Sequence, residues 1–231
     1  MTITIPPSFK PNPPALNRFQ QRLEERLLEV LKSNPSADAP YHNNRHMKMM
    51  WVIAQVLWEA ESVGLPPDQL DWGLETLMFA CLLHDYDHSA GKDNDHYNVL
   101  RAREFVSELI GRHGYSLPGN VIHDIDSAIA CTQYPFVKEP CSVLERVVRD
   151  ADVLYATLSN DPTVLMEDLR TEIGTAAGRY IPYDEMLSGQ INFASNVTLY
   201  TAMGKTLFDA FSPWYIKRLE QYIHSKGNPD V

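Results

Sequence analysis

Residues 82–88 read Leu-Leu-His-Asp-Tyr-Asp-His, so two imidazoles and two carboxylates directly follow an apolar run. That run, residues 78–83, contains only small or apolar side chains, and no lysine or glutamate interrupts the polar cluster after it. We therefore expect the cluster to lie at the buried end of a helix, where unpaired charges would cost several kcal/mol. Imidazole nitrogen and carboxylate oxygen together bind zinc, manganese, magnesium, iron or nickel. The stretch predicts a buried metal site.

Composition limits the possible partners. The chain has 231 residues, enough for one well-filled core or two small ones. Its net charge of −10 argues against a nucleic-acid duplex or an anionic membrane as partner, although a metal can attract an anionic small substrate. The three cysteines, Cys81, Cys131 and Cys141, form no Cys-x-x-Cys pair, which favours a reducing cytoplasm. We find no signal pattern and no apolar run near the roughly 18 residues of a membrane span.

Apolar periodicity predicts an all-α protein, with one helical domain over residues 15–225. Prolines predict an extended arm over residues 1–14, and residues 226–231 form a predicted tail. Alternating strand patterns never exceed three or four residues. Six predicted helices have both ends defined, and they span residues 15–31, 41–63, 67–84, 118–132, 162–177 and 184–211. Three more have one end defined: a helix that follows the turn-rich segment 89–98 and ends at 112, one that begins at 140, and a last one that begins at 213.

Two further polar clusters accompany residues 82–88. Residues 41–46, Tyr-His-Asn-Asn-Arg-His, place His42 and His46 four positions apart, on one face of the predicted helix. Both could bind one ion, or one could bind the ion while the other meets the substrate, or both could be ordinary histidines at a helix start. Residues 149–152, Arg-Asp-Ala-Asp, follow an apolar helix face and could supply another ligand, or they could form a local salt bridge. The remaining histidines are expected to be structural or exposed: His96, His113, His123 and His224.

The order of these clusters is more specific than any one of them. A helical histidine, a His-Asp pair after an apolar helix and an aspartate after another apolar helix resemble the HD superfamily of metal-dependent phosphohydrolases. That family is all-helical and holds its metal with a His, His-Asp, Asp set. The resemblance implies a single HD-domain bundle in which the metal ligands are His46, His84, Asp85 and Asp152. Asp152 is preferred to Asp150 because the last ligand of the family follows alanine in an Ala-Asp pair.

Within that superfamily, residues 41–46 and 84–88 are similar to the YHNxxH and HDxDH signatures of the class I 3′,5′-cyclic-nucleotide phosphodiesterases. This similarity implies that His42 is the general acid, and we assign Tyr41 to the nucleotide pocket. The family follows HDxDH with Pro-Gly, whereas this chain has residues 89–91, Ser-Ala-Gly.

A segment near the C-terminus extends the resemblance. Residues 188–193, Ser-Gly-Gln-Ile-Asn-Phe, resemble the SQVGF segment of the same phosphodiesterases, whose glutamine and phenylalanine hold the nucleobase. Those roles fall on Gln190 and Phe193.

The residue types suit phosphate-ester hydrolysis. One or two divalent cations would activate water and offset the phosphoryl charge, and His42 as an imidazolium could protonate the leaving oxygen. Asp85 could bridge a second cation, because one carboxylate can join two ions about 4 Å apart. We expect three further side chains to orient the ligands: Asp87, His88 and Asp150.

The leading prediction is therefore a cytoplasmic hydrolase, a phosphodiesterase that acts on a small nucleotide, with a 3′,5′-cyclic nucleotide as the preferred substrate class. An HD-type nucleotidase, triphosphohydrolase or alarmone hydrolase would share the metal site and differ at Gln190 and Phe193. A non-catalytic, metal-stabilised nucleotide-binding module is the third possibility, and it would not need the additional histidine at position 42.

Overall fold

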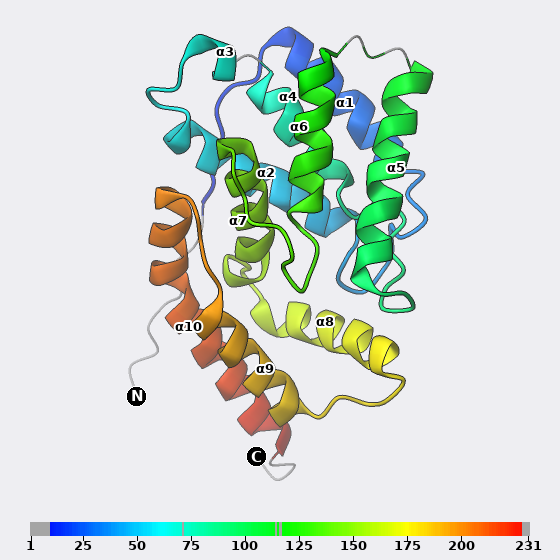
Figure 1. Ribbon diagram of the computed structural model, residues 1–231. Coiled ribbons are helices and arrows are strands. Elements are labelled where there is room, and N and C mark those ends of the chain that lie inside the picture. Colours follow the sequence, from blue (N-terminus) through cyan, green and yellow to red (C-terminus); the bar gives the residue numbers. More distant parts are fainter. Residues whose placement is uncertain (1–9, 71, 114, 116, 228–231) are drawn as a thin grey trace.

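The computed structural model describes residues 10–70, 72–113, 115 and 117–227, and within these residues every regular element is a helix (Figure 1). This confirms the all-α prediction. The predicted arm and tail lie largely outside the described residues, and no described helix is long and apolar enough to cross a membrane. The helices are α1 (Arg18–Leu31), α2 (Asn44–Glu61), α3 (Pro67–Leu70), α4 (Gly73–Leu83), α5 (Asp95–His113), α6 (Gly119–Ala130), α7 (Val143–Thr157), α8 (Pro162–Ala177), α9 (Tyr183–Asn196) and α10 (Ala202–Gly227).

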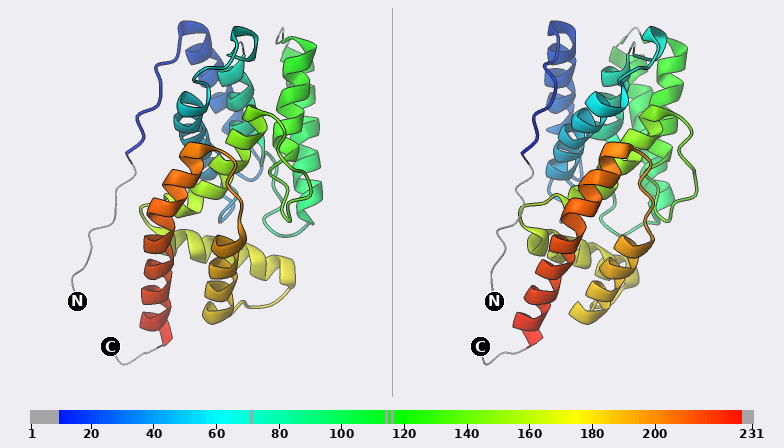
Figure 2. Two further views of the ribbon diagram at one scale, coloured as in Figure 1. Left: turned by 60° about the vertical axis from the view of Figure 1, so that its left-hand side comes forward. Right: turned by 90° about the vertical axis from the view of Figure 1, so that its left-hand side faces the viewer.

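Helix α2 lies at the centre and packs mainly against α7 and α4. Periodicity predicts an apolar stripe of Met47, Met50, Ile53, Val56 and Leu57 on this helix. All but Val56, which is partly buried, are fully inaccessible. Helices α8, α9 and α10 extend below this bundle, and α10 also reaches up beside α7 (Figure 2). A second, smaller apolar cluster holds these three helices together: Met166, Ile181, Met186, Tyr215 and Leu219.

The helix predicted over residues 67–84 is broken into α3 and α4. Trp72, just before α4, has a φ of 65°, a left-handed conformation that a continuous helix excludes. The next residue, Gly73, lies against the Trp58 ring so closely that a Cβ would stand 2.2 Å from it. The packing of Trp58 therefore fixes where α4 begins, and periodicity alone does not reveal it.

The prediction for residues 184–211 was also wrong, because α9 ends at Asn196 and α10 begins at Ala202 and runs through Pro213. The cause is the buried carboxylate of Asp150. It accepts hydrogen bonds from the backbone N–H of Tyr200 at 3.0 Å, from the N–H of Thr201 at 2.7 Å and from the Thr201 hydroxyl at 2.7 Å. These groups bind α7 instead of continuing a helix, so the chain turns here.

Replacing Asp150 with Ala should destabilise the fold, because three donors, two of them buried, would lose their acceptor. We expect a loss on the order of 3 kcal/mol in the free energy of unfolding, measured by urea denaturation. Asp209→Ala, at an exposed position of α10, is the matched control and should change stability by no more than about 0.5 kcal/mol. A stable Asp150→Ala protein would show that another contact holds the start of α10.

Candidate metal centre

Three of the four polar side chains after α4, those of His84, Asp85 and His88, are buried as the sequence predicts, and that of Asp87 is not. Only 1% of His84 and 5% of Asp85 is exposed, and nearly all of α4 before them is buried. His84 Nδ1 lies 3.1 Å from the carbonyl oxygen of Cys81, which can accept only if Nδ1 carries the proton. The lone pair of a neutral His84 is then on Nε2, the nitrogen that faces the other predicted ligands.

The four predicted metal ligands converge although they come from α2, from the end of α4 and from α7. His46 Nε2 lies 3.0 Å from His84 Nε2, 3.2 Å from Asp152 Oδ1 and 3.3 Å from Asp85 Oδ2. His84 Nε2 lies 2.9 Å from Asp85 Oδ2 and 3.8 Å from Asp152 Oδ1. Ligands about 2.1 Å from one cation stand roughly 3 Å from each other, so these separations suit a shared ion.

A second observation supports this fit. Asp85 Oδ2 is buried within 3.3 Å of two imidazole nitrogens, yet it makes no well-directed hydrogen bond with any described residue. Buried polar atoms in native proteins almost always have a partner. A divalent cation would supply that partner, and the donor set of two imidazoles and two carboxylates suits the metals predicted from the sequence.

The electrostatics of the cluster point the same way. Burial lowers the pKa of His46, but the carboxylates of Asp152 and Asp85 raise it further, to about 9. Burial raises the pKa of Asp85, but the nearby charges of His84 and His42 hold it well below its usual range. Asp85 thus stays ionised beside a positive charge. A bound cation would take the place of the proton on His46, since ligation requires a neutral imidazole.

His42 does not lie on α2, which corrects the predicted helix over residues 41–63. Asn43 caps the helix, and its side-chain oxygen accepts from the N–H groups of Arg45 and His46. The N–H groups of Tyr41 and His42 instead donate to Oε1 of Glu172 on α8, at 2.7 and 3.1 Å. They therefore bind a residue 130 positions away, and the helix starts after them.

Glu172 also holds the His42 side chain, with Oε2 2.5 Å from Nδ1. Burial alone would lower the pKa of His42, but the carboxylates of Asp85 and Glu172 raise it above its usual value. Burial alone would raise the pKa of Glu172, but its contact with His42 holds it below its usual value. The two side chains therefore form an ion pair. Sequence reasoning missed Glu172, because it lies in an ordinary helix with no motif around it.

His88 packs against His42, with ring centroids 4.0 Å apart and planes tilted by 31°. Its Nδ1 accepts from the Ala90 N–H at 3.1 Å, which fixes the ring. The ligating atoms of His42, His88 and Glu172 lie within 4.8 Å of one another, so this group also could hold a cation. The direct bond between His42 and Glu172 equally suits an imidazolium–carboxylate pair.

Gly91 allows Glu172 to approach the site. Its φ is 86°, and a Cβ at this position would stand 2.3 Å from the backbone oxygen of Glu172. Only glycine fits this conformation and this contact without strain. The Ser-Ala-Gly turn of residues 89–91 thus supports α8 at the residue that pairs with His42.

Two predicted orienting residues lie elsewhere. The Asp87 side chain is 49% exposed and lies 3.9 Å from Arg101, and both Asp150 oxygens bind the start of α10. Both findings correct the prediction that these carboxylates orient the metal ligands. Each helical residue turns by about 100°, so Asp150 and Asp152, two positions apart, point to nearly opposite sides of α7 and cannot face the same site.

The predicted nucleotide residues occupy two places. Tyr41 is 9% exposed and packs against His42 and His46, so its ring backs the histidines instead of facing a nucleotide. Gln190 lies on α9, where its Oε1 accepts from the Tyr215 hydroxyl at 2.7 Å. Burial raises the pKa of the Tyr41 hydroxyl well above its usual value, and the nearby Tyr215 raises it further. Phe193, also on α9, packs against the main core.

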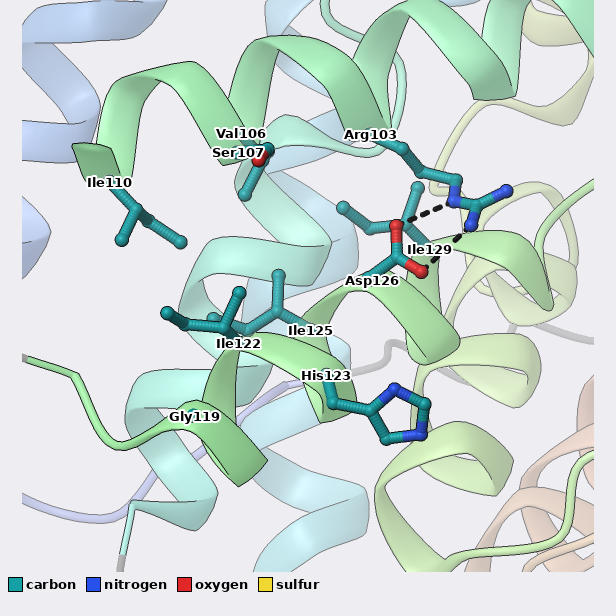
Figure 3. Close-up of a pocket in the computed structure, with 10 residues that line it drawn as sticks. All are labelled: Arg103, Val106, Ser107, Ile110, Gly119, Ile122, His123, Ile125, Asp126 and Ile129. Carbon is teal, nitrogen blue, oxygen red and sulfur yellow. Dashed lines mark hydrogen bonds and ion pairs between the residues drawn. The ribbon is translucent and has the colours of Figure 1, made fainter. Parts of the chain in front are cut away.

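A hollow between α5 and α6 is separate from this centre (Figure 3). It has a volume of about 310 Å³, and His123 lines it together with several isoleucines. Its charged groups, Arg103 and Asp126, form two hydrogen bonds of 2.7 Å with each other. They neutralise one another, so the hollow offers no unpaired charge to a ligand.

Three elements of this helical bundle bring two histidines and two aspartates together. This arrangement is typical of a metal-binding domain whose polar groups suit a hydrolytic centre. Residues 44–157 match the family model of the HD domain. Through this segment the chain belongs to the HD-domain superfamily of metal-dependent phosphohydrolases, and the segment includes all four predicted ligands. No curated protein matches the chain.

Replacing Asp85 or Asp152 with Ala should abolish hydrolysis and reduce bound metal, because each variant removes a predicted ligand. Metal content by elemental analysis and turnover of the same samples test this. Treatment of the wild-type protein with a chelator should lower its melting temperature, since the binding free energy is lost and the apposed carboxylates lose a counter-charge. Near-normal metal and turnover in either variant, or an unchanged melting temperature, would contradict the ligand assignment.

Proposed function

We propose that this protein is a metal-dependent phosphodiesterase that hydrolyses a 3′,5′-cyclic nucleotide. The observation that carries the proposal is the ion pair of His42 and Glu172 beside the four predicted ligands. The His42 ring centroid lies 5.7 Å from that of His46, and 25% of the His42 side chain remains exposed. A purely structural ion would not need a protonated histidine at its accessible side.

In this proposal, different residues bind the metal, donate the proton and position the proton donor. A divalent cation held by His46, His84, Asp85 and Asp152 would activate water and offset the phosphoryl charge. Glu172 accepts a hydrogen bond at His42 Nδ1, so His42 Nε2 is the nitrogen that can donate a proton to the leaving oxygen. The His88 ring packs on His42 and limits its rotation. Glu172 and His88 thus position the proton donor.

Gln190 and Phe193 support a nucleotide as substrate. A nucleobase has apolar faces and a polar edge, so a specific pocket needs an aromatic ring to stack on and an amide to bind the edge. Both residues lie on α9, three positions apart. The Tyr215 hydroxyl occupies Gln190 Oε1, which leaves the amide nitrogen to donate to an acceptor on the base.

A panel of substrates tests the proposal. Purified protein would be incubated with manganese or magnesium and with cyclic nucleotides, linear nucleoside mono- and triphosphates and an alarmone, and the products identified. Conversion of a cyclic nucleotide into a linear monophosphate supports the phosphodiesterase. Turnover of linear nucleotides alone favours the alternative HD phosphohydrolase, and nucleotide binding without turnover favours the binding module.

His42 and His46 should behave differently when each is replaced with Ala. His42→Ala should retain the metal and lose roughly 10²-fold to 10⁴-fold in kcat, because a general acid contributes about that much. His46→Ala should lose both metal and activity. Glu172→Gln should retain the metal and lose part of the rate. Metal loss in the His42 and Glu172 variants would instead make these residues ligands of a second cation.

Gln190→Ala and Phe193→Ala should raise the KM for a cyclic purine nucleotide strongly. They should leave hydrolysis of ribose 3′,5′-cyclic phosphate, which has no base, nearly unchanged, because bare ester hydrolysis requires neither side chain. Steady-state kinetics on both substrates provide the measurement. Equal losses on the two substrates would mean that these side chains only support the fold, and the generic HD phosphohydrolase would be favoured.

A further inference from the structure

The connection between α6 and α7, residues 131–142, is a surface loop with a fixed base. Arg149 of α7 is only 2% exposed, and its guanidinium donates to the backbone carbonyl oxygens of Cys131 and Lys138. The same guanidinium lies 3.7 Å from the centroid of the Phe136 ring. Three contacts from one buried side chain therefore hold the loop backbone in place.

This loop presents Tyr134 next to the candidate centre. The Tyr134 N–H donates to Asp95 Oδ2 at 2.6 Å, and Asp95 Oδ1 lies 3.6 Å from His88 Nε2. His88 in turn packs on His42. The loop reaches down toward α8, the helix that carries Glu172 (Figure 1). Tyr134 is 56% exposed, so the core does not account for its position.

The exposed ring of Tyr134 contacts Phe193. The two ring centroids are 6.0 Å apart and the planes meet at 65°, an edge-to-face arrangement. One ring comes from the loop and the other from α9, so together they form an aromatic corner between two separate elements. Tyr134 also meets Phe136 edge to face at 5.3 Å, and its exposed part is the aromatic surface that this corner offers to solvent.

We propose that Tyr134 is a specificity-determining residue, and that the aromatic corner of Tyr134 and Phe193 binds the nucleobase of the substrate. The inference rests on the proposed function, and it adds a residue for which the sequence gives no signal. An aromatic face stacks on any base, because every base has a π-face. The base of the loop is fixed by Arg149, so little ordering is required of Tyr134 when a base binds.

The test compares Tyr134→Ala, Tyr134→Phe and Val137→Ala on a cyclic purine nucleotide and on ribose 3′,5′-cyclic phosphate. Tyr134→Ala should raise the KM for the nucleotide roughly 10-fold, a typical loss for one stacking ring, and leave kcat unchanged. It should not affect the base-free substrate. Tyr134→Phe should resemble the wild type, because the ring remains. Val137, 72% exposed in the same loop, should tolerate Ala with no change in either substrate.

The outcomes separate the two proposals. If the wild type prefers the nucleotide to the base-free substrate and Tyr134→Ala keeps that preference, the inference is overturned while the proposed function stands. Equal losses on both substrates, or a matching loss in Val137→Ala, would reduce Tyr134 to a structural part of the loop and also overturn the inference. If the wild type handles both substrates equally, no base is recognised and the inference is overturned while the proposed function stands. If the wild type hydrolyses no cyclic nucleotide, the proposed function fails and the inference fails with it.

Discussion

Two carboxylates, each within 4 Å of the same two buried imidazole nitrogens, impose the main constraint on this molecule. Ionised acids that close together are costly unless a positive charge and well-packed surroundings offset them. Helix α2 supplies those surroundings, because its buried stripe packs against α4 and α7, the other two sources of the cluster. The most extensive helix packing and the most polar cluster therefore depend on the same three helices.

The metal centre and the groups proposed for proton transfer and substrate choice come from different parts of the chain. The HD segment, residues 44–157, contains the four predicted ligands and ends before α8. Glu172, Gln190 and Phe193 all lie beyond it, and His42 lies just before it. Gly91 joins the two parts, because its missing side chain lets the turn after the His-Asp motif touch the α8 backbone. Glu172 thus reaches His42 from a helix that lies outside the HD segment.

Sequence patterns predicted what depends on local periodicity or on the order of motifs. The apolar stripe of α2, the bounds of α8 and the convergence of His46, His84 and Asp152 all followed from such patterns. Contacts between distant residues were not predictable in this way. The start of α2 depends on Glu172, and the break between α9 and α10 depends on Asp150, which lies about 50 residues earlier in the chain. In both places a buried carboxylate binds backbone N–H groups that periodicity would assign to a helix.

One turn of α7 contacts the loop with Tyr134, the start of α10 and the other predicted ligands. Arg149 holds the loop that carries Tyr134, Asp150 holds the start of α10, and Asp152 reaches the other predicted ligands. Each points in a different direction, because successive helical positions are rotated by about 100°. A rotation of α7 by one residue would break all three attachments at once, and the buried Arg149 and Asp150 would lose their hydrogen-bond partners. Residues 149–152, for which the sequence also allowed a local salt bridge, therefore fix the register of α7 and with it the position of Asp152 in the candidate centre.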